Sequence, residues 1–222
     1  MFQQAAALIR SGVAEQAVCL MDIADDWGRE YELELYEETY DAAICFAKEF
    51  PSTLWCWGNH DLSYKWHCYE SGYSSFASVT VQRKLLDLRE VIPENNLQYV
   101  HKIDNVLFSH GGISKFFVEE FVPKRIYNDA DAVIENINRL GREEMWNDAS
   151  PIWLRPQGKN IRLYKPRKNL QVVGHTPMTR LTREGNVISC DVFSTYRDGR
   201  AIGTQEFLLL DTITWEYRGI KL

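Results

Sequence analysis

The sequence predicts an α/β fold, because short, continuous apolar runs alternate with longer amphipathic segments along its 222 residues. The run at residues 17–21 has the length and composition of a strand covered on both faces. The segment at residues 29–50 carries apolar side chains at helical spacing and acids on the opposite side. With 45% apolar residues the chain can bury one substantial core, so we expect one domain over residues 1–222.

The first quarter of the chain is predicted to alternate helix and strand. Residues 2–11 place apolar side chains on one helical face, and the strand at residues 17–21 follows. The helix at residues 29–50 stops at Pro51, because proline cannot continue a helix. Residues 53–57 then form a second apolar strand.

The remainder predicts a hairpin, further helices and a strand-rich tail. Residues 97–103 and 106–109 form the hairpin over an Asp104-Asn105 turn. Helices are expected at residues 79–90, 115–121 and 130–146. A strand is expected at residues 170–173, and an antiparallel meander at residues 187–191, 206–211 and 214–219.

Composition limits the kinds of binding partner and the cellular compartment that we expect for this chain. The net charge of −6 and the pI of about 5.4 argue against nucleic acid as a partner. The sequence contains no apolar run long enough to cross a bilayer, and its first residues lack the layout of a signal peptide. Five cysteines without a close pairing motif indicate a reducing compartment. We therefore expect a cytoplasmic protein with no membrane partner, and the oligomeric state stays open.

Side chains that can bind a divalent metal follow strand-like runs at four places. Asp22 follows the run at residues 17–21, and Asn59 follows the second strand. His110 and His175 follow two later strands in the same way. Ligands in α/β sheets sit beyond the carboxyl ends of strands, so we expect these side chains to converge. Two imidazoles, an amide and a carboxylate suit Mn²⁺, Fe or Zn²⁺ better than Mg²⁺ alone. The occurrence of all four in one order, each after a strand-like run, makes phosphate-ester chemistry at a metal centre the leading hypothesis.

The order of these motifs resembles that of the calcineurin-like metallophosphoesterases, and more narrowly the bacterial and phage-type serine/threonine protein phosphatases among them. The matching blocks are Met21-Asp22-Ile23-Ala24-Asp25, Gly58-Asn59-His60-Asp61, His110-Gly111-Gly112 and Gly174-His175-Thr176-Pro177. The resemblance implies a layered αββα sandwich, in which two mixed β-sheets face each other and helices cover the outside. It places the active site at one rim of the sheets.

The resemblance also implies a metal-dependent phosphoester hydrolase. Asp22 would bridge two metal ions, and Asn59, His110 and His175 would complete one of the two sites. Mn²⁺ is the expected ion, with Fe or Zn²⁺ as alternatives, and the family is dinuclear. Metal-activated hydroxide would attack a phosphomonoester directly. The substrate would be a phosphorylated protein or small molecule.

Three further residues receive catalytic roles from the same resemblance. His60 would protonate the leaving oxygen as the general acid, and Asp25 would hold its other ring proton. Arg155 would grip the phosphoryl oxygens, and the alternative is a surface charge beside a tryptophan.

The sequence departs from the family pattern at three places, and these departures leave alternative functions open. Asp26 stands where the family often has an arginine, and Met21 stands where it has a glycine. The family's Asp-x-His-Gly block, which would precede residues 2–11, is missing, so the fold would lack its first strand and one metal most of its ligands. We expect a misassigned start or a fragment. The alternatives are a catalytically impaired remnant with one metal site, and a phosphodiesterase or dinucleoside polyphosphate hydrolase.

Other polar and aromatic residues are predicted to have structural roles, or their role stays open. Asp61 could cap the segment that follows it. His101 is expected on the open face of its strand, and His67 lies outside every motif. Tyr64 and Trp66 could form an aromatic wall beside His60.

Overall fold

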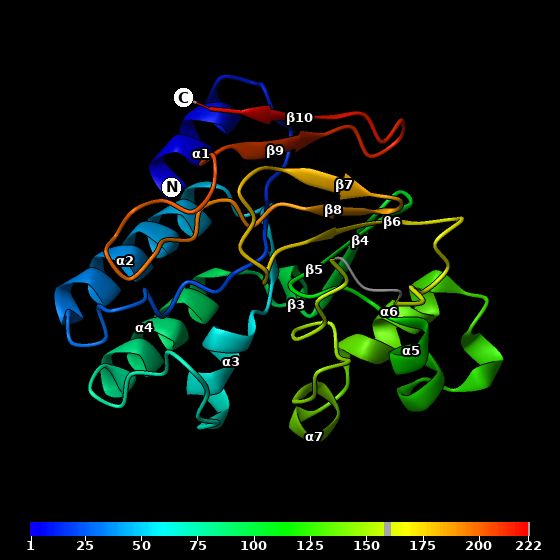
Figure 1. The fold of residues 1–222 in the computed structure, drawn as a ribbon, viewed down its shortest axis with the longest axis horizontal. Helices are drawn as coiled ribbons and strands as arrows, with labels where there is room; N and C mark the ends of the chain where they lie inside the picture. Colours follow the sequence, from blue (N-terminus) through cyan, green and yellow to red (C-terminus); the bar gives the residue numbers. More distant parts are fainter. Residues whose placement is uncertain (158–160, 222) are drawn as a thin grey trace.

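The computed structural model describes residues 1–157 and 161–221 (Figure 1). The helices are α1 (Phe2–Arg10), α2 (Leu33–Glu49), α3 (Asn59–Trp66), α4 (Ser78–Val91), α5 (Lys115–Phe121), α6 (Ala130–Asn138) and α7 (Arg142–Met145), with 3₁₀ turns η1 (Glu94–Asn96) and η2 (Lys124–Ile126). The strands are β1 (Val18–Cys19), β2 (Leu54–Cys56), β3 (Leu97–Gln98), β4 (Val100–Ile103), β5 (Val106–Ser109), β6 (Leu170–Val173), β7 (Thr182–Glu184), β8 (Val187–Ser189), β9 (Phe207–Leu210) and β10 (Tyr217–Ile220).

The strands form two facing sheets and a separate hairpin. The smaller sheet has the order β1-β2-β3, and its neighbours are parallel. The larger sheet has the order β4-β5-β6-β8-β7 and is mixed, because β4 and β7 are antiparallel to their neighbours while β5, β6 and β8 run parallel. The strands β9 and β10 pair with each other as an antiparallel hairpin.

The apolar strands alternate their side chains between two cores. Val106 and Phe108 on β5 pack with Cys56 of β2 in the core between the sheets. Leu107, between them in sequence, belongs to the outer core that also contains α5 and α6. Because β5 is covered on both faces, all of its residues are buried. The β9–β10 hairpin adds partly buried side chains, among them Leu208, to the core between the sheets.

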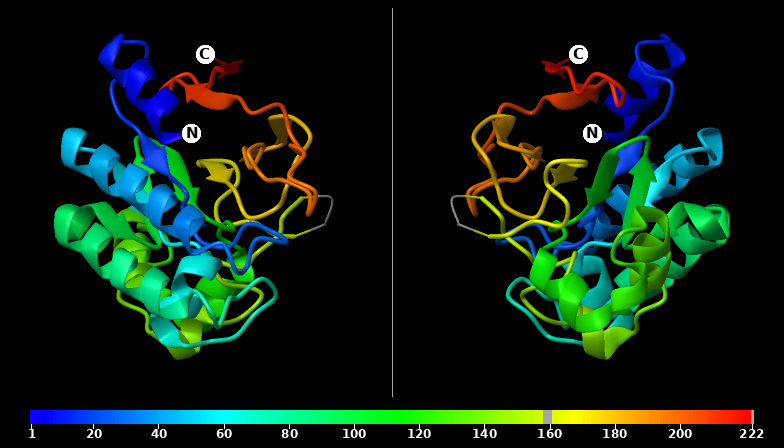
Figure 2. Two further views of the ribbon diagram at one scale, coloured as in Figure 1. Left: turned by 90° about the vertical axis from the view of Figure 1, so that its left-hand side faces the viewer. Right: turned by 90° about the vertical axis from the view of Figure 1, so that its right-hand side faces the viewer.

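Helices cover the outer faces of both sheets, which confirms the predicted αββα sandwich (Figures 1 and 2). On the smaller sheet, the ring of Trp55 on β2 lies 6.0 Å from that of Phe2 on α1 and 6.2 Å from that of Phe46 on α2. On the larger sheet, Asn138 of α6 pairs with the edge strand β4. Its amide nitrogen donates to Val100 O at 2.9 Å, and its amide oxygen accepts from Val100 N at 2.9 Å.

Several elements differ from their predictions. The predicted strand at residues 17–21 is limited to β1, whose residues are partly exposed because it lies at a sheet edge. The helix expected at 130–146 divides into α6 and α7, and β3 pairs in parallel with β2 instead of extending the hairpin. In the predicted meander, only β9 and β10 pair, since β8 joins the larger sheet. The helix α3 and the strand β7 were not predicted.

The fold buries His101 of β4, so the prediction of an open strand face for this residue is wrong. Its exposed fraction is 8%, because β2 and η1 cover it. The ring Nε2 lies 3.1 Å from the carbonyl oxygens of both Trp55 and Asn96, and it therefore donates to them.

This burial predicts a pH-dependent stability. Burial lowers the pKa of His101 below its usual value of 6.5, so the unfolded chain takes up a proton that the folded chain resists. The contribution to stability is complete above about pH 6.5 and is lost as the pH falls. Urea unfolding in EDTA measures the free energy of unfolding at each pH. Between about pH 7 and pH 5.5, this free energy should fall less steeply for His101→Gln than for the wild type. The difference is at most about 1.4 kcal/mol per pH unit, and equal slopes would contradict the assignment.

Candidate metal centre

Four side chains from separate strand ends meet at one rim of the sandwich. Asp22 follows β1, Asn59 begins α3 after β2, and His110 and His175 follow β5 and β6. The Nε2 atom of His110 lies 2.9 Å from Asp22 Oδ2. It also lies 3.1 Å from Asn59 Oδ1 and 3.1 Å from His175 Nδ1. The four residues predicted as metal ligands are therefore adjacent in space.

The hydrogen bond of the His110 ring identifies its free nitrogen. Its Nδ1 lies 2.7 Å from the carbonyl oxygen of Leu20, and a carbonyl only accepts, so Nδ1 carries the proton. In the neutral ring, Nε2 then offers its lone pair toward Asp22, Asn59 and His175. A backbone carbonyl on the distal nitrogen is a common support for metal-binding histidines.

The donor set fits a divalent cation. Across residues 1–157 and 161–221, one group of acidic, histidine or cysteine side chains is close enough to share an ion. In this group Asp22, His110 and His175 each offer an atom within 4.8 Å of the others. His175 is buried, and its Nε2 has no hydrogen-bond partner among the described residues. Burial is the main cause that lowers the pKa of His175 to about 2, and the guanidinium of Arg155 adds to it, so the ring stays neutral and able to ligate.

The loop that carries Asp22 is held in an unusual backbone conformation. Met21 and Asp22 have φ angles of 50° and 57°, a region that favours glycine. Asp61, fully buried on α3, supports this turn because its Oδ2 accepts from Asp22 N at 2.7 Å and its Oδ1 accepts from Ile23 N at 3.1 Å. Asp61 thus fixes the loop that carries Asp22, a role the sequence did not indicate beyond a possible cap.

The first turn of α3 binds the Asp22 carboxylate directly. The backbone N–H of His60 donates to Asp22 Oδ1 at 3.0 Å, as expected for an anion at a helix N-terminus. Gly58 precedes this turn, and a Cβ there would lie 2.0 Å from Asp22 Oδ1 and 2.6 Å from Asp22 N. Position 58 therefore requires glycine, because Asp22 leaves no space for a side chain there.

His60 and Asp25 form a pair next to the four predicted ligands. Asp25 Oδ2 lies 2.8 Å from His60 Nδ1, and Asp25 Oδ1 accepts hydrogen bonds from Tyr36 Oη, at 3.2 Å, and from Tyr64 Oη. Burial opposes the charged ring, but the carboxylate of Asp22 and the hydrogen bond to Asp25 raise the pKa of His60 to about 10. Tyr64 is buried beneath the pair, so it is not an exposed wall of a substrate groove.

Glu70 is a site residue that sequence reasoning missed. Its Oε2 accepts from Asn59 Nδ2 at 2.7 Å, and its Oε1 lies 3.7 Å from His60 Nδ1. It comes from the loop between α3 and α4, where no motif or periodicity marks it. The contact arises from how that loop folds back over the start of α3.

Arg155 and Asp26 lie at the border of the site. Arg155 is exposed, and its Nη1 donates to the carbonyl oxygen of His175 at 2.8 Å and to Thr176 Oγ1 at 3.3 Å. Asp26, which stands where the family often has an arginine, accepts from Thr195 Oγ1 at 2.5 Å. Its carboxylate therefore ties the loop after β1 to the segment between β8 and β9.

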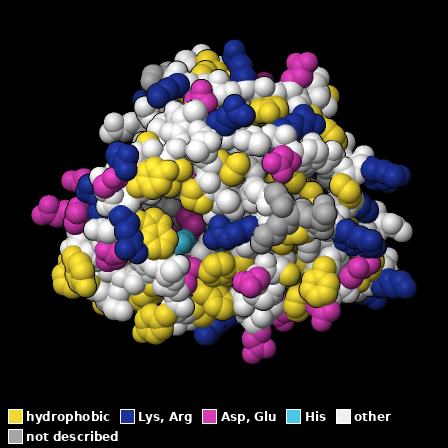
Figure 3. All heavy atoms as spheres, in the orientation of Figure 1, with side chains coloured by type: hydrophobic (Ala, Val, Ile, Leu, Met, Phe, Trp, Pro, Cys, Tyr) yellow, Lys and Arg dark blue, Asp and Glu magenta, His cyan; other side chains and the backbone are white. Residues whose placement is uncertain are grey.

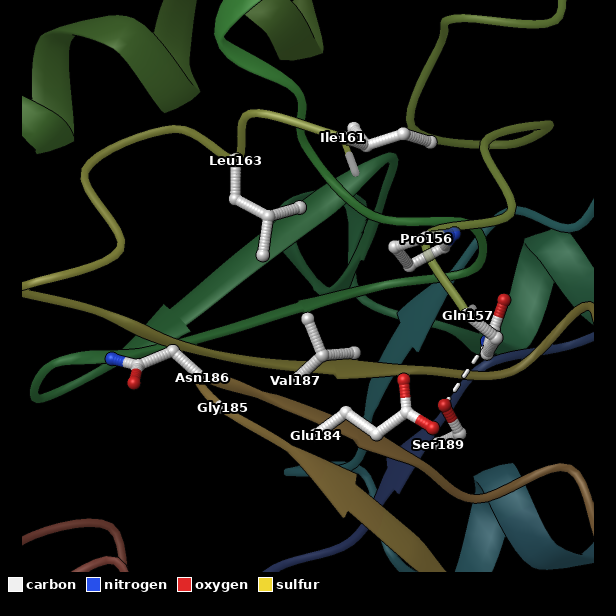
Figure 4. A pocket seen from close by; sticks show the side chains of 9 residues that line it. All are labelled: Pro156, Gln157, Ile161, Leu163, Glu184, Gly185, Asn186, Val187 and Ser189. Atoms are coloured by element: carbon white, nitrogen blue, oxygen red, sulfur yellow. Dashed lines mark hydrogen bonds between the residues drawn. The ribbon is translucent and has the colours of Figure 1, made fainter. Parts of the chain in front are cut away.

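The surface near these elements is hollowed. Figure 3 shows a depression in which a histidine and an acidic side chain are visible between hydrophobic and basic side chains. A separate cavity of about 250 Å³ lies between the side chains of Pro156, Gln157, Ile161 and Leu163 and the β7–β8 hairpin, and Leu163 and Val187 face each other across it (Figure 4). None of the predicted ligands lines this cavity.

The comparisons with known proteins agree with the geometry. A sequence model of the calcineurin-like phosphoesterase family matches residues 2–202, so the chain belongs to this family, whose members use divalent metals to hydrolyse phosphate esters. No match was found among curated protein sequences. No helix in the described part of the chain is long and apolar enough to span a bilayer.

Solved structures share the fold at low sequence identity. A cold-active protein-tyrosine phosphatase from a psychrophilic Shewanella species is 16% identical, with a TM-score of 0.56, and the match covers 93% of this chain and 69% of that one. A further structure of a cold-active protein tyrosine phosphatase is 16% identical over 92% of this chain and 67% of its own, with a TM-score of 0.53. These matches establish the common fold.

Proposed function

We propose that the protein is a metal-dependent phosphomonoesterase that acts on a phosphorylated protein or small molecule. The convergence of lone-pair atoms from Asp22, Asn59, His110 and His175 at one rim is the observation that carries this proposal. Membership of the calcineurin-like phosphoesterase family supports the reaction class. Mn²⁺ is the ion we propose, with Fe or Zn²⁺ as alternatives, since this mixture of nitrogen and oxygen donors suits all of them.

A bound divalent ion supplies Lewis-acid polarisation of phosphoryl oxygens and activation of water. The remaining tasks fall to side chains of this chain. His60, protonated near neutral pH, gives a proton to the leaving oxygen, and Asp25 keeps its ring in the orientation for that transfer. Arg155, held beside His175 by its Nη1, would bind the phosphoryl oxygens through its other N–H groups.

A second candidate is a chain that holds one ion and is catalytically impaired. It is favoured by the finding that Asp22, His110 and His175 form one metal-capable group among the described residues. The stoichiometry of Mn²⁺ in titration calorimetry separates the two candidates, since the family's dinuclear centre takes two ions per chain. One ion per chain together with weak turnover would favour the second candidate.

The role of His60 is tested with two substrates that differ in their leaving groups. His60→Asn should lower kcat for phosphoserine by about 10²- to 10⁴-fold, because a serine alkoxide needs a proton. The loss for p-nitrophenyl phosphate should be smaller, because nitrophenolate leaves without one. His67→Asn is the matched control, as His67 is exposed and lies outside the site. Equal losses with both substrates would defeat the general-acid assignment.

A further inference from the structure

We propose that Glu70 is a positioning residue of the metal centre, which turns the amide oxygen of Asn59 toward the ion. This inference rests on the proposed function, because it takes Asn59 as a ligand. Glu70 Oε2 lies 2.7 Å from Asn59 Nδ2, and on the other side of the same amide Asn59 Oδ1 lies 3.1 Å from His110 Nε2. The amide is thus held between a carboxylate and the predicted ligands.

The chemistry of an amide explains why such a partner matters. The oxygen and nitrogen ends of an asparagine side chain are nearly equal in shape, so packing alone does not choose between two orientations. Only the oxygen can ligate a cation, because the NH₂ group donates and offers no lone pair. The amide nitrogen donates to Glu70 Oε2, so this bond forms only when the nitrogen end of Asn59 faces Glu70. Asn59 then presents its oxygen to His110 and to the position of the proposed ion.

The burial of Asn59 and Glu70 strengthens this choice of amide orientation. Asn59 is 1% exposed and the side chain of Glu70 is 6% exposed, so water has little access to replace either partner. A reversed amide would lose this bond and would turn its NH₂ group, which has no lone pair for a cation, toward His110.

The loop of Glu70 is fastened at both ends. Cys68 N donates to Ser63 O at 2.9 Å, and Ser74 N donates to Tyr64 Oη at 2.8 Å. Between them, Gly72 lies so close to His60 that a Cβ would be 3.2 Å from its ring Cε1. The carboxylate is therefore delivered to Asn59 by a segment that packs on α3.

The contacts assign Glu70 to Asn59 and not to His60. Its Oε1 is 3.7 Å from His60 Nδ1, which is beyond hydrogen-bond distance, whereas Asp25 Oδ2 is 2.8 Å from the same atom. Asp25 therefore serves the general acid, and Glu70 serves the ligand next to it.

Mn²⁺ affinity of the full chain, measured by electron paramagnetic resonance without substrate, tests the proposal. Glu70→Ala should weaken binding by about 10- to 100-fold, the loss typical of a partner that orients a metal ligand. Glu70→Gln keeps an acceptor oxygen for the amide and should stay within about 3-fold of the wild type. Thermal unfolding of the metal-free variants checks that they fold.

The Asn59→Asp background gives the decisive comparison. An aspartate offers oxygen at both ends and needs no orienting partner, so Glu70→Ala should no longer weaken Mn²⁺ binding there. An equal loss in both backgrounds, or an unchanged affinity of Glu70→Ala in the wild-type background, would overturn the role of Glu70. A wild-type chain that binds no Mn²⁺ would instead overturn the proposed metal function.

Discussion

Replacing His110 with alanine is expected to lower Mn²⁺-dependent hydrolysis of p-nitrophenyl phosphate by about 10³-fold or more. Its Nε2 is the atom around which Asp22, Asn59 and His175 gather, at 2.9 to 3.1 Å. Residues that only orient a ligand cost about 10- to 100-fold when removed, so the loss of a ligand should exceed that range. The values of kcat/KM and the Mn²⁺ affinity, measured on the same preparations, should fall together.

A control variant and a rescue experiment show whether the loss of activity in His110→Ala arises from metal binding at this site. His67→Ala removes an exposed histidine outside the site and should leave kcat/KM within about 2-fold, as expected for a surface substitution. Excess Mn²⁺ should restore part of the activity of His110→Ala if weaker binding is the cause. A variant that retains both its affinity and its activity would show that the ion is held elsewhere.

The site could be predicted from sequence where its residues follow strands directly. His110 comes directly after the buried strand β5 and His175 one residue after the buried strand β6, and the two strands pair in parallel and so end at the same edge. A short, continuous apolar run identifies such strands, and the rule for ligands at strand ends then places the side chains. The order of short motifs added the αββα architecture through a family resemblance.

The parts that escaped prediction depend on contacts between distant segments. Asp61 binds the backbone of Asp22 across 39 residues, and Glu70 binds the side chain of Asn59 from a loop without a pattern. The helix α3 was missed because its first turn, from Asn59, is polar and has the composition of a turn. His101 was misplaced because the cover from β2 and η1 is a tertiary property, which strand alternation does not reveal. The single-domain boundary remains a prediction.

Gly58→Ala is expected to damage the site severely although it adds one methyl group. At this position φ is −92° and ψ is 161°, which any residue adopts, so backbone strain is not the cause. The added Cβ would lie 2.0 Å from Asp22 Oδ1 and 2.6 Å from Asp22 N, and the carboxylate would have to move. A displacement of about 1 Å at a reacting centre can cost about 10²-fold, so kcat/KM should fall by at least that factor. Overpacking should also lower the free energy of unfolding by about 1–3 kcal/mol.

Gly174→Ala is the matched comparison, because Gly174 also stands immediately before a predicted ligand. A Cβ there would meet Leu20 Cβ at 3.6 Å and His110 Nδ1 at 3.8 Å, which are ordinary van der Waals distances. Its kcat/KM should stay within about 3-fold of the wild type, since no atom must move. If both alanine variants lose activity equally, the requirement at Gly58 is not steric. If neither does, Asp22 can move without cost, and its place beside His110 is not what the reaction needs.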